Sequence, residues 1–163
     1  MAEVSKPQPF VRAPGAGSTL NIMGVTHIYK ATAAETGGSF SLWEAVFPPG
    51  AGAPPHTHTR EDEAFFVLEG ELVFDSEGEA TPRSVGASGF FFGARGRRHA
   101  VRNAAVKPAR ALILSAPSVG LDQMFAELDS ASAAVMPGFA IIAAITAKYG
   151  VTIDPPASGN ADQ

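Results

Sequence analysis

GAGAPPHTHTREDEAFFVLEG, at residues 50–70, is the stretch of sequence that decides the fold. His56 and His58 are two residues apart, so on an extended segment their imidazole rings point to the same side. Glu63 follows five positions later, beyond a short polar bend, and begins a strand-like run that ends at a turn-prone Glu-Gly pair. Imidazole nitrogens and a carboxylate oxygen bind first-row divalent metals, and this few protein ligands leave coordination positions open for chemistry.

A second stretch, GASGFFFGARGRRHAVRN at residues 86–103, supplies a further candidate ligand, His99. This histidine follows a glycine-containing turn and opens another strand-like segment. Together the two stretches resemble the paired motifs of the cupin superfamily. The first stretch reads Gly, five residues, His-Thr-His, four residues, Glu, six residues, Gly, and it matches the family pattern at every fixed position.

The second stretch departs from the family pattern at two turn positions. It keeps Gly96, His99 and Asn103 at the family spacing, but Ser88 stands where the family has glycine and Ala94 where it has proline. We expect Asn103 to be a turn or supporting hydrogen-bonding residue and not a ligand.

The resemblance implies that His56, His58, Glu63 and His99 hold one divalent transition metal ion. Fe, Mn, Ni, Co, Cu and Zn all accept these ligands, so the ligand types leave the metal open. Each donor atom must be deprotonated, and we therefore expect metal affinity to fall as the pH drops through the histidine range.

Short strands separated by turns dominate residues 19–117. Seventeen glycines and thirteen prolines occur in short clusters, and strand-like runs with turn signals between them predict an all-β sandwich or barrel. We expect residues 71–75 to pair back onto residues 65–68. The resemblance implies the same class, a cupin jelly-roll β-barrel.

The pattern changes to a helical one after Pro117. Leu121, Met124, Phe125 and Leu128 follow helical spacing, and residues 142–149 repeat it. These residues predict one or two C-terminal helices, either on the outside of the barrel or across its mouth, with the first stripe more typical of core than of a lid. The expected layout is an N-terminal arm at 1–18, the barrel at 19–117, helices packing on it at 118–150 and a flexible tail at 151–163.

Charge and composition exclude several classes of function. The chain of 163 residues has a net charge of -4 and no cysteine. It lacks the basic field that nucleic acids require, the negative balance opposes anionic membranes, and no disulfide is possible. No apolar run is long enough for a membrane span. We expect one cytoplasmic domain that forms a homodimer through its arm and exposed sheet edges.

Several apolar residues share the side of the candidate ligands. Phe65 and Val67 have the strand parity of Glu63, and Val101 has that of His99, so all three are expected to line the metal cavity. The alternative is that they merely fill the barrel. Either way, the absence of lysine at inward positions favours a small apolar or aromatic substrate.

Two groups of basic residues lie outside the motif ligands. Arg95, Arg97 and Arg98 form either an anion clamp or, as is more typical of such clusters, a solvated loop that pairs with Glu61 and Asp62. His27 has no motif around it and is interpreted as a partly buried strand histidine.

Within the cupins, the sequence resembles quercetinase-type (flavonol 2,4-) dioxygenases. The resemblance rests on residues 56–63, on the Phe-Phe-Val-Leu-Glu-Gly that follows Ala64, and on the Lys-Tyr-Gly-Val at 148–151. It implies a metal-dependent oxidoreductase that cleaves a small phenolic or enolic substrate with O2. Glu63 would then be the catalytic residue, both ligand and proton acceptor. The alternatives are a non-redox metal cupin (isomerase, cyclase or lyase) and a non-catalytic metal- or small-molecule-binding cupin. A complete set of four ligands argues against the non-catalytic one.

Overall fold

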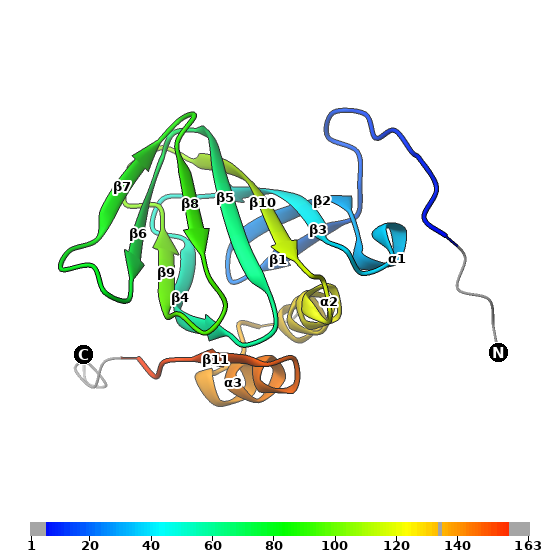
Figure 1. Ribbon diagram of the computed structural model, residues 1–163. Helices are drawn as coiled ribbons and strands as arrows, with labels where there is room; N and C mark the ends of the chain where they lie inside the picture. The colour runs from blue at the N-terminus through cyan, green and yellow to red at the C-terminus, as the bar shows by residue number, and fades with distance from the viewer. Residues whose placement is uncertain (1–5, 134, 157–163) are drawn as a thin grey trace.

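Two antiparallel β-sheets face each other, and the C-terminal helices lie across one end of them in the computed structural model, which describes residues 6–133 and 135–156 (Figure 1). The six-stranded sheet has the order β1 (Thr19–Ile22), β2 (Val25–Ala31), β3 (Ser41–Phe47), β10 (Ala109–Ala116), β5 (Asp62–Glu69) and β8 (Phe90–Gly93). The five-stranded sheet has the order β11 (Val151–Ile153), β4 (Gly52–His58), β9 (His99–Arg102), β6 (Glu71–Ser76) and β7 (Arg83–Gly86). The helices are α1 (Ala33–Thr36), α2 (Leu121–Ser132) and α3 (Phe139–Lys148).

This architecture confirms the expected jelly-roll fold with C-terminal helices. Among the described residues no strand pairing joins the two sheets, so they do not form a closed hydrogen-bonded barrel. Burial alternates along β2, β3 and β10, which places Trp43, Ala45 and Phe47 in the core. On the opposite face, Arg110 donates hydrogen bonds to Glu44 at 2.6 and 3.0 Å.

Two expectations about strands were wrong. Residues 71–75 do not pair with residues 65–68, because β6 pairs with β7 and β9 in the five-stranded sheet while β5 pairs with β8 and β10 in the other. Gly70, with φ of 71°, turns the chain from one sheet to the other. The predicted flexible tail begins too early, since β11 at its start pairs with β4. The rest of that tail, from residue 157, and residues 1–5 of the predicted arm lie outside the described residues.

The C-terminal helices close one end of the space between the sheets. α2 buries Leu121, Met124 and Leu128, and α3 buries Ile142 and Ile145. The Asp122 carboxylate at the start of α2 accepts hydrogen bonds from the backbone N–H of Ala33 and the hydroxyl of Ser41, both at 2.6 Å. The apolar stripes therefore belong to the core and also form the end wall of the space between the sheets. No helix within the described residues has the length and apolarity needed to cross a membrane.

A further tie links the end of α3 to the loop between β4 and β5. Thr59 donates hydrogen bonds from its backbone N–H and its hydroxyl to the carbonyl of Gly150, at 2.9 and 2.8 Å. Gly150 has φ of 80°, and a side chain at this position would lie 2.6 Å from the Thr59 hydroxyl. The loop that separates His58 from Glu63 is therefore fixed against the C-terminal segment.

Candidate metal centre

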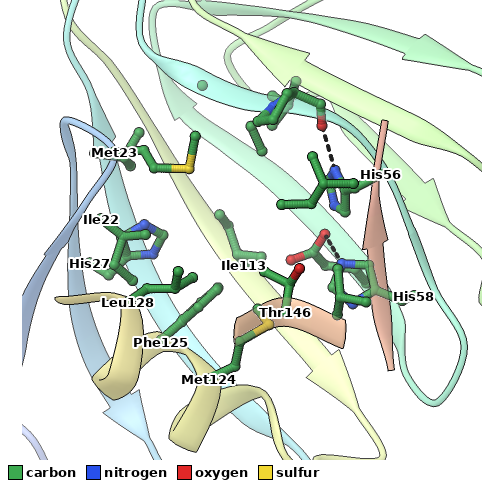
Figure 2. Close-up of a pocket in the computed structure, with 18 of the residues that line it drawn as sticks. Ile22, Met23, His27, His56, His58, Ile113, Met124, Phe125, Leu128 and Thr146 are labelled. Carbon is green, nitrogen blue, oxygen red and sulfur yellow. Dashed lines mark hydrogen bonds and ion pairs between the residues drawn. The ribbon is translucent and has the colours of Figure 1, made fainter. Parts of the chain in front are cut away.

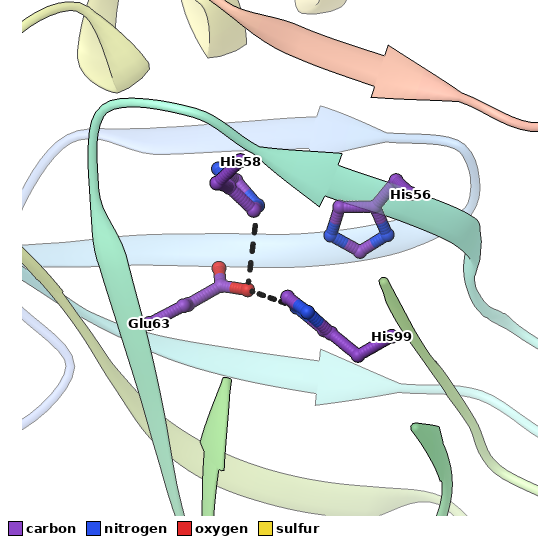
Figure 3. Close-up of side chains that lie close together, drawn as sticks. All are labelled: His56, His58, Glu63 and His99. Atoms are coloured by element: carbon purple, nitrogen blue, oxygen red, sulfur yellow. Dashed lines mark hydrogen bonds and ion pairs between the residues drawn. The ribbon is translucent and has the colours of Figure 1, made fainter. Parts of the chain in front are cut away.

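Four buried side chains converge between the two sheets, and each offers one ligand atom (Figure 3). The potential ligand atoms of His56, His58, Glu63 and His99 all lie within 4.8 Å of one another. Glu63 Oε2 is 3.6 Å from His58 Nε2 and 3.3 Å from His99 Nε2. The structure thus brings together the four residues that the sequence motifs predict as ligands.

Strand register explains this convergence. His56 and His58 occupy alternate positions on β4, so both rings face the space between the sheets. His99 on β9 is the register partner of His56. Glu63 reaches the same point from β5 of the opposite sheet, where it pairs with Gly93 on β8. The site therefore depends on how the two sheets stack.

Backbone carbonyls fix the tautomers of two of the histidines. His56 Nδ1 donates to the Pro54 carbonyl at 2.7 Å, and His99 Nδ1 donates to the Arg97 carbonyl at 3.3 Å. A carbonyl only accepts, so each Nδ1 carries the proton, and His56 Nε2 keeps its lone pair for a metal. His99 Nε2 lies 3.3 Å from Glu63 Oε2 and offers its lone pair to a metal once it no longer carries the proton that it donates to this carboxylate. His58 Nδ1 is buried and has no hydrogen-bond partner within the described part of the chain.

The charges of the site also suit a cation. Burial, followed by the neighbouring histidine charges, lowers the pKa of His56 to about 4, and burial lowers that of His58. Burial raises the pKa of Glu63, but the hydrogen bond from His99 and the histidine charges outweigh it and bring that pKa down to about 2. Burial lowers the pKa of His99, but Glu63 outweighs this and raises it. At neutral pH the site holds an ionised carboxylate and at least two neutral imidazoles, which are the forms that bind metal.

Gly93 is a site residue that sequence reasoning missed. A Cβ atom at this position would lie 2.9 Å from His99 Cε1 and 3.1 Å from His99 Nε2. Only a residue without a side chain lets the His99 ring lie against β8, facing Glu63. The signal is hidden in the sequence because the contact depends on which strand β8 pairs with.

An apolar cavity of about 90 Å³ adjoins the four residues (Figure 2). Phe65 and Val101 line it, as the strand parity predicts. Val67 is fully buried but is not among the lining residues, because it packs one repeat further along β5 in the core. The helices contribute lining residues to the end wall, namely Met124, Phe125, Leu128, Ile142 and Thr146.

His27 also lines this cavity, which sequence reasoning did not anticipate. Its burial was expected, but its position is explained by the pairing of β2 with β3, which brings His27 next to Trp43 with ring centroids 6.3 Å apart. Strand parity alone could not relate His27 to the motif ligands, the first of which, His56, lies 29 residues further along.

Asn103 acts as the expected turn residue. Its side-chain amide donates to the carbonyls of Phe47 and Lys107, both at 2.8 Å, and its side-chain oxygen accepts from the N–H of Ala105 at 2.9 Å. It stabilises the turn after β9 and is not among the clustered ligands.

The three arginines near the second motif are paired with carboxylates. Arg95 contacts Asp62 at 2.6 Å, Arg97 contacts Glu77 at 3.3 Å, and Arg98 contacts Asp154 at 2.6 Å. These pairs favour the solvated loop over an anion clamp.

Glu61, in contrast, is not an arginine partner as the sequence had indicated. Its side chain is buried, and neither carboxylate oxygen has a hydrogen-bond partner among the described residues. Burial raises its pKa.

Comparisons with known proteins agree with this fold. The cupin domain family model matches residues 43–115, a range that holds all four clustered residues. The chain is 35% identical over 92 residues to a protein of Oryza sativa subsp. japonica named "Putative germin-like protein 9-2". The match covers 52% of this chain and 43% of that protein. The chain therefore spans less than half the length of this relative.

Solved structures show the same fold. A predicted oxalate decarboxylase from Thermotoga maritima gives a TM-score of 0.58 at 21% identity, covering 66% of this chain and 99% of that one. A sugar phosphate isomerase of the cupin superfamily from Silicibacter pomeroyi gives 0.52 at 21% identity, covering 59% and 61%. A DMSP lyase from Ruegeria pomeroyi is 33% identical, with a TM-score of 0.43, over 48% of this chain and 39% of that one. The first two likenesses show the fold alone because of their low identities, and the third carries no argument because of its low TM-score.

Proposed function

We propose that this chain, whose fold and domain match support the cupin superfamily, is a metal-dependent enzyme that acts on a small apolar substrate. The observation that carries the proposal is a cluster of four buried potential ligands, three of which, His56, His58 and Glu63, line the wall of an apolar cavity. A site that served only to stabilise the fold would have no need of an adjoining space. His56, His58, Glu63 and His99 are the proposed ligands.

Glu63 is the proposed catalytic residue. Its carboxylate is ionised at neutral pH, and Oε2 faces the two imidazoles. Oε1 can then accept a proton from a hydroxyl group of the substrate. A bound divalent ion would supply Lewis acidity at that hydroxyl and, if redox-capable, would allow reaction with O2. The low pKa makes Glu63 a weak base, so it suits only a hydroxyl group that is already acidified.

The cavity restricts the substrate in size and polarity. Its volume of about 90 Å³ is below the roughly 150 Å³ of a cavity that accommodates benzene. The lining residues include no lysine or arginine. Away from the metal ligands, a phosphate group would therefore find no counter-charge. Even a single ring would need some outward movement of α2 and α3, and a three-ring flavonol would need a much larger one. We propose a substrate no larger than one ring.

The reaction we propose is O2-dependent cleavage of a small phenolic or enolic compound. The sequence resemblance to quercetinase-type dioxygenases supports this, and the apolar cavity keeps water away from reactive species. A non-redox isomerase, cyclase or lyase uses the same ligands, so the two reactions differ in their need for O2 and in the metals that support them.

The test is oxygen uptake by protein reconstituted separately with Fe²⁺, Mn²⁺, Ni²⁺, Co²⁺, Cu²⁺ and Zn²⁺. A panel of single-ring phenols and small enols, with one flavonol for comparison, is offered to each form. We expect uptake with at least one redox-capable metal, none with Zn²⁺, and none in the His58→Ala variant.

Two other outcomes are informative. Stoichiometric metal without O2 uptake, together with turnover of an enol under nitrogen, would replace the dioxygenase with the non-redox enzyme. No bound metal after any reconstitution would contradict the site itself.

A further inference from the structure

His27 lies on the wall of the cavity opposite the candidate metal ligands. Figure 2 shows its ring on one side of the space, with His56 and His58 on the other. It comes from β2, whose inward positions Val25 and His27 both line the cavity. The space between His27 and the two ligand histidines is bounded by apolar side chains such as Ile113 and Leu128.

Aromatic contacts hold the His27 ring, and no hydrogen bond from the described residues reaches its side chain. Its centroid is 5.0 Å from that of Phe125 and 6.3 Å from that of Trp43. His27 is only 8% exposed, and its Nδ1 is buried without a hydrogen-bond partner among the described residues. Burial lowers its pKa to about 4, so at neutral pH the ring is uncharged, with one nitrogen that donates and one that accepts.

An unpartnered imidazole is an expensive way to fill such a position. A buried polar group without a partner costs free energy that an apolar side chain of the same shape would not cost. Phenylalanine would keep the contacts with Phe125 and Trp43 without that cost. The imidazole is therefore explained best by a ligand that contacts the ring when the cavity is filled.

We propose that His27 hydrogen-bonds the end of the substrate that lies away from the metal. The inference rests on the proposed function and narrows its substrate class. The substrate carries a metal-binding group at one end, an apolar middle and a neutral hydrogen-bonding group, such as a hydroxyl or a carbonyl, at the other. The remaining wall is apolar except for the Thr146 hydroxyl, whose proton is donated to the Ala143 carbonyl, so the contact with His27 decides which way round the molecule binds.

The experiment uses Co²⁺-loaded protein and matched pairs of short carboxylates. Propionate, butyrate and valerate are compared with β-hydroxypropionate, γ-hydroxybutyrate and δ-hydroxyvalerate, which differ only by a terminal hydroxyl group. Binding at the metal is followed by the visible absorption of Co²⁺. The variants are His27→Phe, His27→Gln and Tyr29→Phe. Tyr29 is the matched control, because its side chain is also buried on β2 but does not line the cavity.

In the wild-type protein, the hydroxylated member of the pair whose length spans the cavity is expected to bind about tenfold more tightly. His27→Phe removes this preference and leaves the affinity for the plain carboxylate unchanged. His27→Gln keeps part of the preference, and Tyr29→Phe keeps all of it. A preference that survives in His27→Phe, or is absent from every wild-type pair, would overturn the inference.

A second measurement, on the metal-free protein, is independent of any probe. If His27 is retained for ligand binding, His27→Phe has an equal or higher thermal midpoint at neutral pH. A midpoint several degrees lower would show a structural role and contradict the inference, even if no carboxylate enters the cavity. Failure of the proposed function would look different, because Co²⁺ itself would then not bind at the four ligands.

Discussion

At the scale of single residues, the geometry of the site depends on a position that has no side chain. Gly93→Ala would place a methyl group 2.9 Å from His99 Cε1, and the ring would have to move away from Glu63. We expect this variant to fold and to bind metal about tenfold to a hundredfold more weakly, as for other changes around ligands. Competition with a chelator of known affinity measures the loss.

Gly86→Ala is the matched control for Gly93→Ala. It lies on β7, the strand before β8 in the chain, and an added Cβ there meets no atom within 4 Å. Its metal affinity should equal that of the wild type. Unchanged affinity in Gly93→Ala would show that the His99 ring has more freedom than the structure indicates.

His27 also makes a prediction about pH. The unfolded chain binds a proton at this residue below pH 6.5, whereas the folded chain does not until about pH 4. The unfolded state therefore binds more protons in this window, and the free energy of unfolding falls as the pH decreases through it. Between neutral pH and pH 4, protonation of His27 in the unfolded chain lowers the free energy of unfolding by about 3 kcal/mol.

His27→Phe removes this contribution. In the metal-free protein, the variant should lose less stability than the wild type between neutral pH and pH 4, as measured by urea unfolding at several pH values. Parallel curves for the two proteins would mean that the folded protein lets His27 take up its proton at the ordinary pKa.

At the scale of structural elements, the turn between β7 and β8 contains a strained residue. Ser88 has φ of 68°, in the left-handed region that favours glycine, and it stands where the cupin pattern has glycine. Ser88→Gly should raise the free energy of unfolding by about 0.5–1 kcal/mol, because the backbone strain that it relieves outweighs the added entropy of the unfolded chain.

Thermal unfolding of Ser88→Gly checks this expectation. Ser84→Gly on β7, where the backbone is not left-handed, should instead destabilise the protein. Equal effects of the two substitutions would show that the turn carries no strain at Ser88.

The elements also show what the sequence could and could not predict. The ligand motifs were predictable because His56, His58 and Glu63 are close in sequence and their spacing sets which way they face. Strand pairing could not be predicted, because β6 has the same alternating pattern whether it pairs with β5 or with strands of the other sheet. Gly93 and His27 also reach the site only through strand pairing, of β8 with β5 and of β2 with β3. The short β11 has too few residues to give a pattern.

At the scale of the whole molecule, exposed aromatic side chains gather on the outer face of the six-stranded sheet over β5 and β8. Phe66, Phe90 and Phe92 are 43%, 61% and 55% exposed, and Phe66 pairs with Phe90 across β5 and β8. Clustered exposed aromatics on a sheet face mark an association surface. A two-fold dimer would bring two copies of this face together, and the expected homodimer is therefore predicted to use it.

Phe90→Glu should convert such a dimer to a monomer, as measured by sedimentation velocity at several protein concentrations. Val106→Glu is the control, because Val106 is 90% exposed but lies in the loop after β9 and not on β5 or β8. A wild-type monomer at all concentrations, or a dimer that persists in Phe90→Glu, would contradict this surface.

The most direct test of the central claim is the metal content of the purified, reconstituted protein. The chain has four histidines, and three of them belong to the proposed centre. Elemental mass spectrometry should find one metal ion per chain in the wild type and in His27→Phe, and almost none in His58→Ala, His99→Ala or Glu63→Gln, with circular dichroism showing that each variant folds. Equal metal in all five proteins, or none in the wild type, would contradict a metal centre formed by His56, His58, Glu63 and His99.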